Sequence, residues 1–127
     1  MKRLLTTLVI LTGLIGSGGA VWAQDLNKGL KAAQSGDFAT AMKEWKPLAE
    51  RGQVAPQYNL GVMYRKGDGV IQNMVSAYMW FNISVANGHT CAIKNGNILA
   101  GNLSSADIVK ARTRAKRCMA SDYKDCD

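Results

Sequence analysis

The sequence contains little of what metal, redox and catalytic sites are built from. Its 127 residues include a single histidine, His89, and three cysteines. No two cysteines form a Cys-x-x-Cys motif, so the composition argues against a zinc or redox centre. Glu44 and Glu50 fall on different faces of one predicted helix and make no obvious acid/base pair. We therefore expect no catalytic residues, no cofactor and no metal.

The sequence also lacks the pattern of β-strands. After residue 23, no stretch alternates apolar and polar residues for long, and Val70-Ile71 is too short for a strand. Apolar residues instead recur at helical spacing between turn signals rich in glycine. The pattern predicts an all-α domain of six helices, near residues 25–35, 38–51, 56–66, 74–87, 90–100 and 105–119.

No apolar run is long enough for a comfortable membrane span. The longest, residues 4–15, follows the basic residues Lys2 and Arg3 and precedes a small-residue segment that ends Val-Trp-Ala. This order is typical of a cleaved signal peptide, here residues 1–23, and an uncleaved leader is the alternative and the only predicted route to a membrane. Cleavage would leave one small domain, residues 24–127.

The charge is basic, with 16 lysines and arginines against nine acidic residues and a formal net charge of +7. For an exported chain this balance favours an acidic partner protein or an anionic envelope surface over nucleic acid. We expect the periplasm of a Gram-negative bacterium, or secretion. In the last predicted helix, Lys110, Arg114 and Arg117 share one side and form a basic ridge. The ridge is either a solvated end face or a contact for such a partner.

Export implies an oxidising compartment, in which cysteines pair. Cys118 and Cys126 lie eight residues apart across the end of the last predicted helix, and we expect a disulfide between them that pins residues 121–125 to the helix. Cys91 has two interpretations. It is either a buried small hydrophobe or one end of an intermolecular disulfide.

A segment that begins near Asp37 returns 36 residues later. Identical pairs at this offset are Ala41 and Ala77, Gly52 and Gly88, and Asn59 and Asn95. A period of this length is the mark of stacked helix pairs, each of which buries its apolar face on its neighbours. Such arrays usually bind other proteins.

Four blocks closely resemble the Sel1-like repeat, a relative of the tetratricopeptide repeat: residues 56–64, 67–70, 77–81 and 86–89. The resemblance spans one full repeat, residues 56–92. It is flanked by a degenerate first pair, 25–52, and by a closing pair with the cysteine-bracketed tail, 90–127. The sequence departs from the family pattern at Pro56, Ile71, Asn73 and Val85.

The resemblance implies a short α-solenoid of about three antiparallel helix pairs that binds a partner protein in its groove. It also implies packing or turn roles for the motif residues Tyr58, Leu60, Gly61, Tyr64, Gly67, Gly69, Val70, Ala77, Trp80, Phe81, Ala86 and Gly88. The sequence identifies neither the partner nor the process.

A second possibility follows from the same resemblance, because some cysteine-rich Sel1-like proteins are associated with penicillin binding or hydrolysis. Ser121 and Lys124 match the Ser-x-x-Lys pattern of penicillin-recognising enzymes. The accompanying Ser-Asp-Asn and Lys-Thr-Gly elements are missing. A small hydrolase acting on β-lactams or peptidoglycan is therefore only the alternative to an adaptor.

Overall fold

The computed structural model describes the backbone of residues 17–127 and the side chains of residues 26–127. This part of the chain is all-helical and contains no strand, which confirms the predicted class. The helices are α1 (Ser17–Gln34), α2 (Phe38–Ala49), α3 (Val54–Lys66), α4 (Met74–Ala86), α5 (Cys91–Ala100) and α6 (Ser105–Ala120).

Helix α1 differs most from the prediction, because it begins at Ser17 rather than near residue 25. It runs through Ala23, the last residue of the predicted leader. Residues 1–16, which make up most of that leader, lie outside the described residues. The leader and its cleavage therefore stay predictions.

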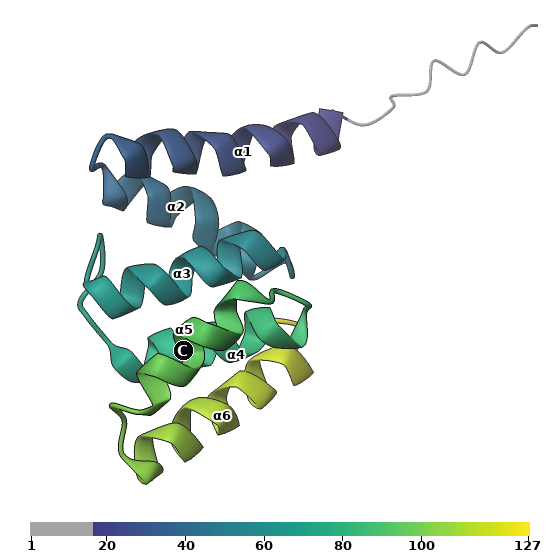
Figure 1. Ribbon diagram of the computed structural model, residues 1–127. Helices are drawn as coiled ribbons and strands as arrows, with labels where there is room; N and C mark the ends of the chain where they lie inside the picture. The colour runs from purple at the N-terminus through teal and green to yellow at the C-terminus, as the bar shows by residue number, and fades with distance from the viewer. Residues whose placement is uncertain (1–16) are drawn as a thin grey trace, which may run out of the picture.

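Helix α4 is the centre of the fold. Its backbone packs against α3, α5 and α6, while α2 packs between α1 and α3, so that the helices form successive layers (Figure 1). Helices α5 and α6 each approach α4 more closely than they approach one another, so α4 rather than α5 positions α6. A helix that is apolar nearly all round needs cover on every side. The buried residues of α4 are Ser76, Ala77, Tyr78, Met79, Trp80, Phe81, Ile83 and Ser84.

Capping side chains fix where three helices begin. Asp37 accepts hydrogen bonds from the hydroxyl of Thr40 at 2.7 Å and from its backbone N–H at 3.2 Å. Both hydrogen bonds stabilise the carboxylate and lower the pKa of Asp37, and the bond from the Thr40 hydroxyl has the larger effect. Asn73 and Ser104 likewise accept the backbone N–H three residues further on, at the starts of α4 and α6.

Trp45 sets how α2 meets α1. Its ring lies against Gly29, where an added Cβ would overlap the ring, and its Nε1 donates to the carbonyl oxygen of Leu26 at 3.3 Å. The side chain of Leu30 is exposed and does not lie on the face of α1 that packs on α2. The face that α2 covers contains Gly29 and the buried Ala32 instead.

Gly61 allows α3 and α4 to approach closely. A Cβ added there would lie 2.5 Å from Cδ1 and 2.6 Å from Cε1 of Phe81, whose side chain is fully buried. Small residues at helix crossings permit short distances between the axes. The α3–α4 contact therefore depends on the missing side chain at position 61.

Gly61→Ala is expected to lower the free energy of unfolding by about 1–2 kcal/mol, because overpacking against Phe81 outweighs the better helix propensity of alanine. The matched control is Gly96→Ala in α5, where an added Cβ meets Phe81 and Tyr78 at an ordinary 3.8 Å. That change is expected to be neutral or stabilising by up to about 1 kcal/mol. Urea denaturation of both variants measures the difference. Equal stabilities would contradict the proposed crossing constraint.

Candidate functional site

A pocket with an aromatic and aliphatic lining lies where α1, α2 and α3 meet. Its volume is about 420 Å³. We call it the aromatic pocket, and its lining residues are Ala33, Phe38, Trp45, Tyr58, Asn59, Val62, Met63, Lys66 and Asp68. Because three helices and the loop after α3 contribute to it, the pocket is a product of the stacking itself.

Residues outside the pocket fix the position of Tyr58 on its wall. The Tyr58 ring stacks on His89, with centroids 4.3 Å apart and an interplanar angle of 10°. Its hydroxyl accepts a hydrogen bond from Nδ2 of Asn95 at 2.7 Å. On another side the ring lies 5.7 Å from that of Phe81. The shape of the pocket therefore depends on α4 and α5 as well.

The loop after α3 closes one end of the pocket at Phe38. A Cβ at Gly69 would lie 2.6 Å from the carbonyl oxygen of Phe38, and Gly69 has a φ of +71°, so only glycine fits this approach without strain. Asp68, the residue before Gly69, also lines the pocket and carries a carboxylate.

Three polar side chains of the aromatic pocket have no bonding partner within the described part of the chain. The side chains of Asn59, Lys66 and Asp68 make no hydrogen bond or ion pair with another described residue. The pocket thus combines aromatic and aliphatic walls with one amide, one cation and one carboxylate. Sites that bind ligands typically have this mixture of apolar lining and a few polar groups.

A side-chain amide network, which sequence reasoning missed, joins α2, α3, the end of α4 and the tail. Gln57 is fully buried. It donates to the carbonyl oxygen of Ala49 at 3.1 Å and accepts from Nδ2 of Asn87 at 2.9 Å. Asn87 also donates to the hydroxyl of Tyr123 at 2.9 Å. Because glutamine is mostly exposed in proteins, nothing in the sequence marks Gln57 as a buried residue or the exposed Asn87 as its partner.

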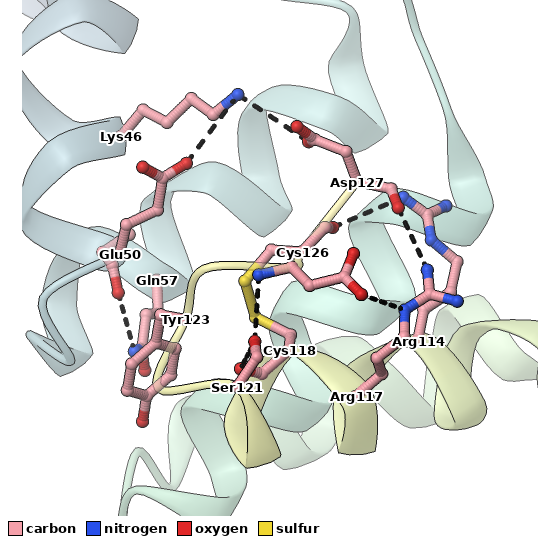
Figure 2. Close-up of a disulfide and its surroundings, with 12 residues drawn as sticks. Lys46, Glu50, Gln57, Arg114, Arg117, Cys118, Ser121, Tyr123, Cys126 and Asp127 are labelled. Atoms are coloured by element: carbon pink, nitrogen blue, oxygen red, sulfur yellow. Dashed lines mark hydrogen bonds and ion pairs between the residues drawn. A yellow bond between two sulfur atoms is a disulfide. The ribbon is translucent and has the colours of Figure 1, made fainter.

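The predicted bridge between Cys118 and Cys126 is present, with Cα atoms 4.3 Å apart. It folds the tail, residues 121–127, back toward α2 (Figure 2). Nζ of Lys46 in α2 lies 3.7 Å from a carboxylate oxygen of Asp127. The tail therefore connects the last helix to the second.

The residues of the basic ridge, Lys110, Arg114 and Arg117, lie side by side on α6 as predicted. With Thr113 and Asp127 they line a second pocket of about 490 Å³, which we call the ridge pocket. The two arginines also contact the tail (Figure 2).

The other motif residues lie in the packing between helices and in turns, apart from Ala86. Leu60, Gly61, Ala77, Trp80 and Phe81 are buried, Tyr64 and Val70 are partly buried, and Ala86 is exposed at the end of α4. Gly67, Gly69 and Gly88 adopt positive φ angles of 76°, 71° and 98° in the turns.

The structure excludes one of the two interpretations of Cys91. The thiol is unbridged and exposed, so the expectation of a buried hydrophobe is wrong, while an intermolecular disulfide remains an open alternative. The cause is the rotation of α5, which turns Ala92, Gly96 and Leu99 toward the core instead.

The hydroxyl of Ser121 is engaged by backbone groups. It donates to the carbonyl oxygen of Cys118 at 2.9 Å and accepts the N–H of Asp125 at 2.9 Å. No hydrogen bond joins it to Lys124 within residues 26–127. In this arrangement the Ser121 hydroxyl closes the turn after α6 through two backbone contacts.

Within the described residues, no three His, Cys, Asp or Glu side chains gather as metal ligands. None of the described helices has the length and hydropathy that crossing a membrane requires. Comparisons with protein families, with characterised proteins and with solved structures gave no match. The function is therefore inferred from the residues and their geometry.

Proposed function

We propose that this chain is an exported, non-enzymatic interaction module that binds another protein through its helical-repeat groove, of which the aromatic pocket is the centre. The supporting observation is the lining of that pocket. Half-buried Phe38, Tyr58 and Val62 offer apolar surface, and Asn59 and Lys66 offer unpaired polar groups. Grooves that hold a peptide segment combine pockets for side chains with polar groups for orientation.

The architecture in this proposal is a short α-solenoid of the Sel1-like, tetratricopeptide-like kind. The 36-residue sequence period and the layered packing of α1 to α4 support it. The close crossing at Gly61 supports it too, because the repeat motif places a glycine there. Repeat arrays bind partners on surfaces formed by several consecutive helices, as the aromatic pocket is.

The proposed location is the periplasm of a Gram-negative bacterium, or the medium, after removal of residues 1–23. The Cys118–Cys126 disulfide fits an oxidising, extracytoplasmic location. An envelope location also suits the choice of partner, because the basic chain would meet acidic proteins and anionic surfaces there.

A photo-crosslinking experiment tests the pocket. A benzophenone amino acid replaces Asn59 in the full chain, in the cells that produce it. We expect a discrete crosslinked protein, and we expect Val62→Lys to lower its yield at least about fivefold, because an unpaired charge in an apolar site disfavours binding.

The controls make the same two substitutions, valine to lysine and insertion of a benzophenone, at positions outside the aromatic pocket. Val109→Lys makes the same change at an exposed valine of α6, and a benzophenone at the exposed Lys116 probes another face. Neither should reproduce the effect. Equal crosslinking at positions 59 and 116, or a yield that Val62→Lys leaves unchanged, would refute the pocket as the binding site.

A further inference from the structure

The basic ridge is occupied by the chain's own tail. Nε of Arg117 lies 3.1 Å from Oδ2 of Asp125, and its Nη2 donates to the backbone oxygen of Asp127 at 3.1 Å. Nη2 of Arg114 donates to the backbone oxygen of Cys126 at 3.5 Å. Figure 2 shows both guanidinium groups turned toward the tail. The ridge thus holds an acidic peptide segment through a carboxylate and backbone oxygens together.

Part of the basic ridge is not covered by the tail. The ridge pocket of about 490 Å³ borders Asp127 and is also lined by Lys110 and Thr113. Lys110 makes no hydrogen bond or ion pair with another described residue. An unpaired cation and a hydroxyl therefore face open space next to the two arginines.

The ionic contacts of the tail are too weak to hold it there alone. The side chains of Arg117 and Asp125 are 49% and 57% exposed, and exposed ion pairs contribute little. Asp122 and Tyr123 have φ angles of 56° and 61°, in a region that residues other than glycine disfavour. The disulfide is the tether, and a short tether keeps the acidic segment at a high effective concentration beside the ridge.

We propose that the basic ridge binds an acidic polypeptide segment of a partner, and that the tail is its intramolecular competitor. A polypeptide fits better than a polysaccharide or a lipid, because the arginines donate to main-chain oxygens as well as to a carboxylate. The ridge lies on α6, away from the lining of the aromatic pocket, so this proposal does not rest on the function of that pocket.

Fluorescence anisotropy with a labelled peptide of alternating aspartate and glycine tests the proposal on the oxidised full chain. Asp125→Asn with Asp127→Asn keeps the disulfide but weakens the competitor, and we expect it to tighten binding about threefold. Cys118→Ala with Cys126→Ala removes the tether, and we expect about tenfold tighter binding. Circular dichroism confirms that each variant is folded at the assay temperature.

A matched pair of lysines tests the site itself. Lys110→Gln removes the unpaired ridge cation and is expected to weaken peptide binding about threefold, while Lys116→Gln makes the same change outside the ridge pocket and should leave it within error. Three results would each overturn the proposal: no peptide binding by any form, equal effects of the two lysine changes, or equal affinity with and without the tether. A response to heparin or anionic vesicles that exceeds the response to the peptide would overturn the class of partner.

Discussion

Replacing Phe81 with alanine is expected to lower the free energy of unfolding by about 3–5 kcal/mol. Phe81 is fully buried in the central helix and packs on the backbone of α3 at Gly61. Gly61 has no side chain that could move into the space, so the cavity would stay open. A domain of this size is stable by about 5–15 kcal/mol in total, and one substitution would remove a large part of that.

Urea denaturation followed by circular dichroism measures this loss. Val85→Ala is the control, because Val85 lies on the same helix and is 36% exposed, and a change of no more than about 0.5 kcal/mol is expected there. Similar losses at both positions would mean that α4 is not covered on the side of Phe81. The central role of α4 in the stack would then be wrong.

The sequence was sufficient for those parts of the fold that local chemistry decides. Asp37, Asn73 and Ser104 start helices because their side chains accept backbone N–H groups, and each is recognisable by its position before an apolar run. The burial of α4 also followed from its composition, since a helix without a polar face has to be covered.

Long-range contacts decided what the sequence could not predict. The rotation of α1 depends on where the Trp45 ring meets Gly29, so helical spacing alone does not show that Leu30 is exposed. The same holds for the candidate site. Trp45 and Tyr58 were predictable as apolar packing residues, but a pocket exists only where neighbouring side chains leave space between them.

The basic ridge shows most clearly which contacts the sequence does not predict. Helical spacing placed Lys110, Arg114 and Arg117 together, and the structure has them on one pocket. That the tail lies over two of them depends on the direction of the turn at residues 122–123, where both φ angles are positive. Aspartate occasionally adopts this region, but tyrosine rarely does, so local propensity does not predict the turn. The disulfide that closes it lies outside the turn.

Removing the Cys118–Cys126 bridge is expected to lower the free energy of unfolding by about 2–3 kcal/mol, because a loop of this length no longer restricts the unfolded chain. The native state loses contacts as well. Without the bridge, the left-handed turn relaxes, and the tail's ion pair with Lys46 and its hydrogen bond from Asn87 are lost together. The measurement is the denaturation midpoint of the Cys118→Ala, Cys126→Ala variant against the oxidised chain.

Two comparisons separate the bridge from the packing of its sulfur atoms. Cys118 is fully buried, so its replacement also leaves a small cavity, whereas reduction of the unaltered chain with dithiothreitol opens the bridge and keeps both side chains. We expect the reduced chain to lose most of what the double variant loses. Cys91→Ala, at the exposed and unbridged thiol, should change the free energy of unfolding by no more than about 0.5 kcal/mol in either condition. If the reduced chain keeps the oxidised midpoint, the tail is held by its own contacts, and the disulfide is not the tether that keeps the acidic segment beside the basic ridge.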